Sequence, residues 1–280
     1  MTANRAMHLS PLPESLVIGI NKSFAGTRLH GAMLDLDHLR TLIHIGQEKA
    51  LGQEWLHREE QERLQTLHYE KRHLEWLGGR ICAKQAALHY LHDNPSAPTA
   101  LRAPQLQIKT AASGRPFLDI SALPADLSIP HISISHSRRY AVAVAASTPC
   151  GIDIQVTSDA LGRVQDRFCS QEEEGILGCD LKKMQLPDHL TLLWAAKEAV
   201  KKGAELTRMP GFLDLALTQI KDIPETEGRA YCLFTLDYQD SHRESGNPQL
   251  QFQVTVCLYQ GYGIGLYVLP ALPCPGVNHA

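Results

Sequence analysis

Residues suited to phosphate binding gather at the end of one predicted strand. In the segment HISISHS, which starts at residue 131, alternation puts the three serines on one face, and Ser135 is followed by His136 and the basic turn Arg138-Arg139. Hydroxyl, imidazole and guanidinium groups at a strand end can hold phosphate oxygens. A Ser-His-Asp hydrolase is the competing interpretation, but a serine cannot generally reach the ring of its own neighbour, and the chain has no G-x-S-x-G elbow.

A second polar pair lies on the strand that should follow. The segment GIDIQ places Asp153 and Gln155 on one face and Ile152 and Ile154 on the other. The preceding TPCG is a natural turn out of an apolar strand, which should set Asp153 one strand away from the ISISHS segment. For this segment taken alone, an edge strand with its polar face in water is the alternative.

The third group lies on a predicted helix. In LLWAAKEAVKKG, the residues Trp194, Glu198 and Lys202 recur at every fourth position and share one face, while leucine, alanine and valine supply an apolar surface for docking. The charged stripe can therefore face a cleft. The alternative is an exposed ion pair between Glu198 and Lys202, which would stabilise the helix by only about 0.2–0.5 kcal/mol.

The surrounding segments alternate between helical and extended patterns. Apolar residues recur at three and four positions between residues 31 and 92, which predicts helices, and short alternating segments between turn signals predict strands over about 106–156. Helices are predicted again at about 166–179 and 187–202, before a last group of strands. This order favours an α+β fold with mostly antiparallel sheets and permits two similar halves that meet near residues 125–150.

The composition narrows the classes of function. The chain has 280 residues, 44% hydrophobic and 20% charged, as expected for one large or two modest globular domains. A net charge of −3 offers no bulk cationic surface for nucleic acid or an anionic membrane, and no apolar run reaches the roughly 18 residues of a membrane span. Seven scattered cysteines without C-x-x-C spacing fit free thiols, so we expect a cytoplasmic protein. His89 and His92 form an H-x-x-H without other nearby ligands, which favours solvated or core histidines over a metal site.

Four short motifs resemble those of the Sfp-type 4′-phosphopantetheinyl transferases. In order, that family shows a G-[KR]-P turn, an S-H-S strand end, a G-I-D-I-E-like strand and a W-x-x-K-E-A-x-x-K helix. This chain has GRP at 114–116, SHS at 135–137, GIDIQ at 151–155 and WAAKEAVKK at 194–202. Together with a stretch from Glu62 to Lys84 that looks like the family's N-terminal helical region, the similarity spans roughly residues 58–205. Each motif alone is weak evidence, whereas four in the same order are specific.

The resemblance implies both a fold and a reaction. The fold would have two similar subdomains in a pseudo-twofold arrangement, residues 1–130 and 131–280, with the metal site in the second. The reaction would transfer the 4′-phosphopantetheine group of coenzyme A to a serine of an apo acyl, peptidyl or aryl carrier protein and release adenosine 3′,5′-bisphosphate. Two fused halves imply a monomer. Because carrier domains are small and acidic, the docking surface should be apolar with a basic rim, and residues from Arg102 to Pro124 could contribute to it.

The resemblance also assigns roles to residues. Asp153 and Glu198 would hold Mg²⁺ or Mn²⁺ with the pyrophosphate of coenzyme A, Glu198 would accept the serine proton, and Lys202 would neutralise charge as the pyrophosphate breaks. Gln155 stands where many members carry glutamate; a neutral amide is a weaker metal ligand, so either two carboxylates suffice or Gln155 acts through water. The nucleotide end, including its 3′-phosphate, would be held by Arg63, Arg115 and His136, with Ser135 as a further donor.

Two other functions remain open at this point. An Mg²⁺ enzyme that cleaves coenzyme A or a nucleotide pyrophosphate with water could use the same ligands, and it would release product without any carrier protein. A non-catalytic carrier-binding protein, in which Gln155 marks the decay of the site, would bind a carrier, but coenzyme A with Mg²⁺ would not raise its melting temperature.

Overall fold

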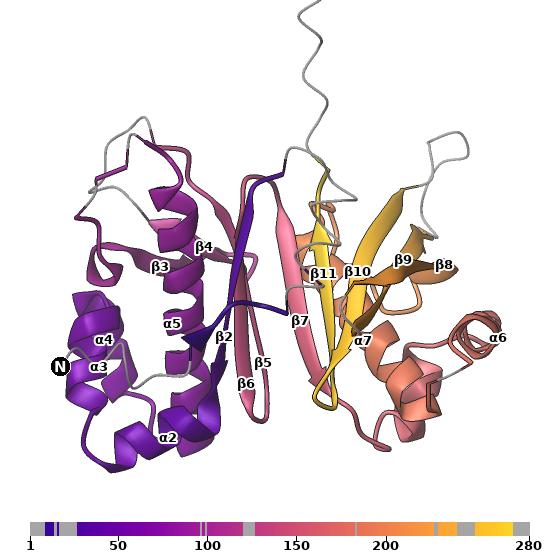
Figure 1. The fold of residues 1–280 in the computed structure, drawn as a ribbon, viewed down its shortest axis with the longest axis horizontal. Coiled ribbons are helices and arrows are strands. Elements are labelled where there is room, and N and C mark those ends of the chain that lie inside the picture. Colours follow the sequence, from indigo (N-terminus) through magenta and orange to yellow (C-terminus); the bar gives the residue numbers. More distant parts are fainter. Residues whose placement is uncertain are drawn as a thin grey trace, which may run out of the picture.

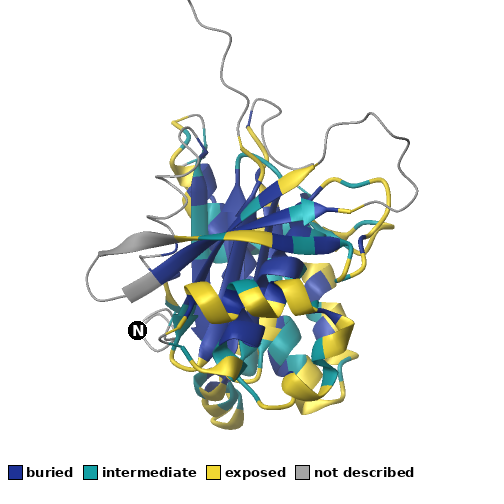
Figure 2. Cartoon of the chain, turned by 90° about the vertical axis from the view of Figure 1, so that its right-hand side faces the viewer, coloured by how far each residue is buried: buried dark blue, intermediate teal, exposed yellow. Residues whose placement is uncertain are grey.

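Two antiparallel β-sheets lie next to each other, and each is covered on its outer face by one long helix (Figure 1). This arrangement is seen in a computed structural model that describes residues 9–13, 16, 27–95, 97–98, 100–119, 127–182, 184–226, 229–239 and 250–270. Buried residues gather in the strands and on the inner sides of the helices (Figure 2). Among the described residues, no helix is both long and apolar enough to cross a membrane.

The first sheet has the strand order β1-β2-β6-β5. Its strands are β1 (Leu9–Ser10), β2 (Leu29–Asp35), β5 (His131–Ser137) and β6 (Tyr140–Ala146). The prediction of helix from residue 31 is wrong for residues 31–35, because this apolar segment pairs with β6. The helix begins only after Asp35, whose carboxylate accepts hydrogen bonds from the amides of Asp37 and His38.

Four helices accompany this sheet, and the longest of them packs on it through a face of leucine, isoleucine, cysteine and alanine. These helices are α2 (Leu36–His44), α3 (Glu48–Trp55), α4 (Arg58–Gln65) and α5 (Glu70–His92). The 3₁₀ helix η2 (Ala103–Gln105) then leads into a separate two-stranded sheet of β3 (Gln107–Thr110) and β4 (Pro116–Asp119).

The second sheet has the strand order β7-β11-β10-β9-β8. Its strands are β7 (Cys150–Val156), β8 (Leu215–Thr226), β9 (Arg229–Tyr238), β10 (Gln251–Tyr259) and β11 (Tyr262–Val268). Its helices are η3 (Gly162–Arg167), α6 (Gln171–Asp180) and α7 (Leu186–Gly203), of which α7 lies across β7, β11 and β10.

The two halves repeat one topology. In each half, an initial strand is followed by a long helix and later by a hairpin, and the second strand of the hairpin pairs with the initial strand. These elements are β2, α5 and β5-β6 in the first half, and β7, α7 and β10-β11 in the second. The prediction of an α+β fold with two similar antiparallel units is therefore confirmed. The chain passes from one sheet to the other between Ala146 and Cys150. The division into residues 1–130 and 131–280 stays a prediction. It would separate β5 and β6 from β1 and β2 of the same sheet.

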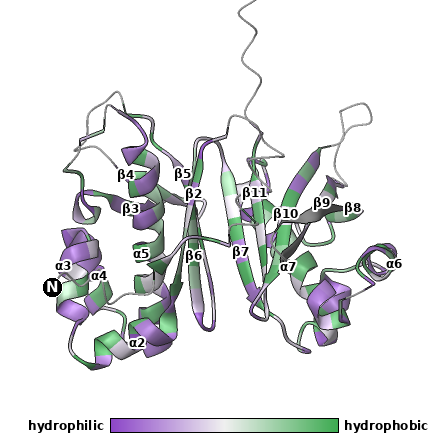
Figure 3. Cartoon of the chain, in the orientation of Figure 1, coloured by the Kyte–Doolittle hydropathy of each residue, from purple (hydrophilic) through white to green (hydrophobic). Residues whose placement is uncertain are grey.

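A shared apolar layer joins the two sheets. Val142 and Val144 of β6 pack in one cluster with Ile152, Ile154 and Ile264 of the second sheet. Figure 3 shows the hydrophobic character of these inner strands. Along the same contact, the three serine hydroxyls of β5 accept hydrogen bonds from backbone amides of β7 at 3.0–3.3 Å. β7 is the edge strand of its sheet, and the serine hydroxyls thus provide acceptors for the backbone amides on its unpaired side.

Candidate active site

Asp153, Ser135 and Lys202 form a polar cluster where β7, β5 and α7 meet. The Ser135 hydroxyl donates to Asp153 Oδ1 at 2.7 Å, and Lys202 Nζ lies 2.6 Å from the same oxygen and 2.9 Å from Ser135 Oγ. Lys202 also donates to the carbonyl oxygen of Ile152 at 3.1 Å. Burial raises the pKa of the Asp153 carboxyl, while the contacts with Lys202 and Ser135 act in the opposite direction. The cluster therefore holds a buried carboxylate by one ammonium and one hydroxyl group.

Glycines explain why α7 approaches the strand that carries Asp153. A Cβ atom on Gly151 would lie 2.0 Å from the carbonyl oxygen of Ala199, and one on Gly265 would lie 2.5 Å from the carbonyl oxygen of Ala195. On the helix side, a Cβ atom on Gly203 would lie 2.5 Å from the nitrogen of Gly151. Any side chain at these positions would push the helix away from the sheet, so the glycines let the charged face of α7 reach β7.

Glu198 lies one turn before Lys202 on α7. Its Oε1 accepts a hydrogen bond from Lys201 Nζ at 2.7 Å, and the Lys201 ammonium group lies 3.9 Å from the centroid of the Phe212 ring. Burial is the main cause of the raised pKa of Asp153, and the negative charge of Glu198 adds to it. A cation bound to both carboxylates would relieve the repulsion between them.

The donor groups at this point suit Mg²⁺ or Mn²⁺. Asp153 and Glu198 supply carboxylate oxygens, and the side chain of Gln155, whose amide nitrogen donates to the Val156 carbonyl at 3.2 Å, could add an amide oxygen. The described part of the chain has no group of three or more His, Cys, Asp or Glu side chains placed to hold a metal ion. An ion here would therefore take further oxygens from a substrate or water, which is the coordination that Mg²⁺ favours. The residues present fit such an ion.

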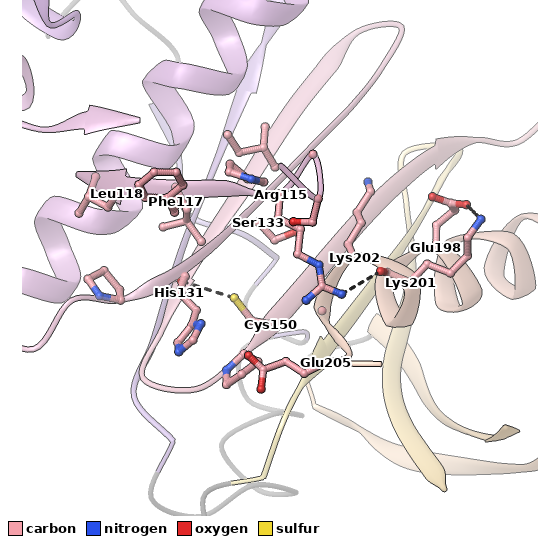
Figure 4. A pocket seen from close by; sticks show the side chains of 18 of the residues that line it. Arg115, Phe117, Leu118, His131, Ser133, Cys150, Glu198, Lys201, Lys202 and Glu205 are labelled. Atoms are coloured by element: carbon pink, nitrogen blue, oxygen red, sulfur yellow. Dashed lines mark hydrogen bonds and ion pairs between the residues drawn. The ribbon is translucent and has the colours of Figure 1, made fainter. Parts of the chain in front are cut away.

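A cavity of about 680 Å³ opens between the two halves beside these residues (Figure 4). Glu198, Lys201 and Lys202 line it from α7, and Arg115 lines it from the turn between β3 and β4. The Arg115 guanidinium group is turned toward the end of α7, where it donates to the carbonyl oxygen of Ala204 and, at 3.5 Å, to that of Lys201. The remaining wall is mostly apolar and includes Phe117, Leu118, Ile129, Pro130, Ile132, Ile134, Pro149 and Met209.

Ser135 and His136, the first two residues of the SHS motif, differ in burial. Ser135 is buried, and its hydroxyl is engaged with Asp153, Lys202 and the amide of Ile154. His136 is 44% exposed, and its Nδ1 lies 3.4 Å from Glu75 Oε1 of α5. Burial lowers the pKa of the His136 imidazole, although Glu75 acts against this shift. The residues that line the large cavity include neither side chain, and their roles toward phosphate stay predictions.

Arg63 lies apart from the other predicted residues. It is exposed on α4, where its guanidinium group donates to Thr66 Oγ1 at 3.2 Å, and it lines a second cavity of about 390 Å³ with Arg72, Trp76 and Arg80. Arg80 lies over the Trp76 ring, 4.9 Å from its centroid. The structure thus brings Glu198, Lys202 and Arg115 to one cavity, links the buried Asp153 to it through Lys202, and places Arg63 at another.

Sequence reasoning missed two features of the site. Lys201 received no role from the sequence, yet it pairs with Glu198 inside the cavity. The glycines of the last strand received none either, although the packing of α7 depends on Gly263 and Gly265. Two glycines at alternate positions of a strand could have signalled a close helix contact.

Comparisons with known proteins identify the C-terminal part of the chain. Residues 149–257 match the model of the 4′-phosphopantetheinyl transferase superfamily. A holo-ACP-synthase structure from Plasmodium yoelii is 16% identical over 43% of this chain and 95% of its own, with a TM-score of 0.34. A holo-[acyl-carrier-protein] synthase structure from Neisseria meningitidis is 17% identical over 42% of this chain and 94% of its own, also with a TM-score of 0.34. At such low scores these two structures carry no argument here.

No curated protein matches the chain. The matched segment contains both the GIDIQ strand and the W-x-x-K-E-A-x-x-K helix, so the resemblance to the transferase family is confirmed where these two motifs occur. The Sfp-type subfamily stays a prediction. Residues 149–257, which carry Asp153, Glu198 and Lys202, thus match the 4′-phosphopantetheinyl transferase superfamily, a family of enzymes.

Proposed function

We propose that this chain transfers the 4′-phosphopantetheine group of coenzyme A to a serine of an apo carrier protein, with release of adenosine 3′,5′-bisphosphate. The observation that carries the proposal is the contact of Asp153 with Lys202, which lines the cavity between the two halves together with Glu198. Two carboxylates and an ammonium group beside a cavity are suited to a metal-dependent displacement at a pyrophosphate.

Asp153 and Glu198 would hold Mg²⁺ or Mn²⁺, with Gln155 acting directly or through water. When bound, the ion would offset negative charge on the pyrophosphate oxygens. Burial raises the pKa of the Asp153 carboxyl, and the Lys202 ammonium group acts in the opposite direction; a bound ion would act in the same direction as Lys202.

In the proposed reaction, the serine oxygen of the carrier bonds to the β-phosphorus, and the bond from this phosphorus to the bridging oxygen breaks. The electron pair of the broken bond stays on adenosine 3′,5′-bisphosphate. Glu198 would accept the serine proton, directly or through water, and Lys202 would stabilise the charge on the leaving oxygen. Ser135 keeps Asp153 and Lys202 in register, with 2.7 and 2.9 Å contacts to them.

The nucleotide end would be held by cations on both sides of the β3-β4 hairpin. Arg115 lines the large cavity, and Arg63 lines the smaller one, where Arg72 and Arg80 add two further guanidinium groups. Three arginines and the Trp76 ring are suited to a phosphate next to a planar base. His136, at the exposed end of β5, is the remaining candidate contact from the resemblance.

The carrier would dock at the mouth of the large cavity. Phe117, Ile129 and Met209 are 43%, 48% and 54% exposed there. Lys201 lines the same cavity, and the exposed Arg208 precedes Met209 in the chain. Apolar groups with basic neighbours suit a small acidic domain. Residues 120–124 of the predicted docking segment Arg102 to Pro124 lie outside the described residues. We further propose that the protein acts as a cytoplasmic monomer.

The test is incubation with coenzyme A, Mg²⁺ and a panel of apo carrier proteins, read by intact mass. We expect a mass gain equal to one phosphopantetheine on at least one carrier, and none with EDTA or with a carrier whose modified serine is replaced by alanine. Adenosine 3′,5′-bisphosphate released at the same rate without carrier would indicate hydrolysis instead. No product with any carrier, and no rise in melting temperature with coenzyme A and Mg²⁺, would contradict the proposal.

A further inference from the structure

Arg115 makes a contact that a phosphate ligand would not need. Its guanidinium group donates to the backbone carbonyl oxygens of Ala204 and Lys201, at the C-terminal end of α7. The last four carbonyl groups of a helix have no partner within the helix, and a cation placed there also interacts favourably with the helix dipole. Arg115 therefore caps the helix that carries Glu198 and Lys202.

The contact joins the two halves of the molecule. Arg115 comes from the hairpin between β3 and β4, which packs against β5 of the first sheet, whereas α7 belongs to the second. The turn that presents it is well defined: Gly114 has a φ of +84°, and Ala111 exchanges hydrogen bonds of 2.9 Å with Gly114 and Arg115. Because the turn fixes the backbone of Arg115, its side chain can hold the end of α7 in place across the cavity (Figure 4).

The capped turn contains both lysines of the site, although only the Lys201 carbonyl is itself a partner of Arg115. The side chain of Lys201 runs to Glu198 Oε1 and that of Lys202 to Asp153 Oδ1, each over the whole length of a flexible chain. If the last turn of α7 frays, both ammonium groups lose their anchor points. We propose that Arg115 is a positioning residue, which acts on the reaction by holding the last turn of α7 in place and thereby aligning Lys202. The effect of Arg115 on the reaction rate rests on the proposed function, whereas its capping of α7 does not.

The experiment compares Arg115→Ala and Arg115→Lys with Lys109→Ala as a matched control. Lys109 lies on the same hairpin, and its ammonium group pairs with Asp119 at 2.6 Å, away from the cavity. The first measurement is hydrogen–deuterium exchange of residues 198–206 in the free protein. We expect exchange to be roughly five- to tenfold faster in Arg115→Ala, because a capping interaction is lost. Arg115→Lys should restore part of the protection, and the control should match the wild type.

The second measurement separates kcat from KM for coenzyme A. A positioning role predicts that Arg115→Ala lowers kcat by roughly 10- to 100-fold, in addition to any rise in this KM from the loss of a phosphate contact. Unchanged exchange of residues 198–206 would overturn the inference, as would an effect confined to the KM for coenzyme A, which would make Arg115 a phosphate ligand only. If the wild type transfers nothing, the proposed function fails, but the exchange result still decides whether Arg115 holds the helix.

Discussion

The two halves of the chain contain the same buried ion pair, but only one of them has candidate catalytic groups beside it. In the first half, Lys84 of α5 pairs with Glu60, whose carboxylate also accepts a hydrogen bond from an amide of β3 at 3.0 Å. In the second, Lys197 of α7 lies 2.6 Å from Glu173, whose carboxylate accepts one from an amide of β8 at 2.7 Å. Each glutamate also occupies position N3 of the helix before the long helix, where its side chain completes a capping box.

The residues that follow the two buried lysines differ. One and five positions after the lysine, α5 has Gln85 and His89, whereas α7 has Glu198 and Lys202. The first strands differ in the same way, since the fourth residue is Ala32 in β2 and Asp153 in β7. The first half thus keeps the scaffold without the carboxylates or the second lysine.

This difference assigns Lys197 to the scaffold. It lies inside the W-x-x-K-E-A motif, yet its counterpart Lys84 makes the same contact where no catalytic group follows. Each pair ties a long helix to the helix before it and to the first strand after it. We therefore expect that removing either lysine affects stability, and that chemistry depends on the positions that differ between the halves.

The largest effect should come from Glu198→Gln, with Gln85→Glu as its counterpart. Loss of the proton acceptor and of one metal ligand should lower the transfer rate by at least about 10²–10⁴-fold, whereas Gln85→Glu should leave it unchanged. Initial rates of carrier modification, read by intact mass with saturating coenzyme A and Mg²⁺, test this. A near-normal rate in Glu198→Gln would remove the distinction between the halves.

Next in size is the loss of a buried lysine. Lys197→Met should lower the free energy of unfolding by about 3–5 kcal/mol, because Glu173 is left buried without its partner. Lys84→Met should also be destabilised, but by less, because Arg80 Nε remains 3.5 Å from Glu60 Oε1. Urea unfolding at pH 7 measures both. The double variant Lys197→Met/Glu173→Met should recover much of the loss. If only one of the two single variants were destabilised, the two pairs would not be equivalent.

The close packing of helix on sheet provides a smaller effect. The fourth residue of the central strand is Gly265 in β11 and Ala143 in β6. Gly265→Ala should cost about 1–3 kcal/mol and slow transfer, because its Cβ would lie 2.5 Å from a carbonyl oxygen of α7. Ala143→Gly should cost about 1–2 kcal/mol through backbone freedom and a lost methyl group, without slowing transfer. Thermal unfolding and initial rates check both, and an unaffected rate in Gly265→Ala would mean that α7 tolerates the shift.

The smallest effect is a pH dependence shared by the two pairs. Burial lowers the pKa of Lys84 to about 8, and it lowers the pKa of Lys197 as well. Between about pH 8 and the unfolded lysine pKa of about 10.4, the unfolded chain binds more protons at Lys84 than the folded protein, so this lysine makes stability rise with pH. The stability of the wild type relative to Lys84→Met should therefore increase from about pH 7.5 to 9.5, and its stability relative to Lys197→Met should change in the same direction because the pKa of Lys197 is lowered as well. A decrease for one variant would show that its pair titrates differently.

Much of the site was predictable from local patterns. The alternation of GIDIQ places Ile152 and Ile154 in the core between the sheets and Asp153 on the other face, and the helix expected at 187–202 is α7. Each of these features depends on residues near in sequence, whose periodicity reflects which side meets the core. The apolar residues 31–35 were misassigned because a short apolar run fits a buried strand as well as a helix.

The sequence by itself determined the kinds of groups, their faces on each element and the family of the segment with Asp153 and Glu198. Only the tertiary structure decided which groups meet: Ser135 holds Asp153, Arg115 turns to the carbonyl groups of α7, and Arg63 lies at a second cavity. The physical reason is that these contacts join residues from different sheets and helices. Their distances are set by glycine contacts and by the pairing of sheets, which periodicity along a single segment does not encode.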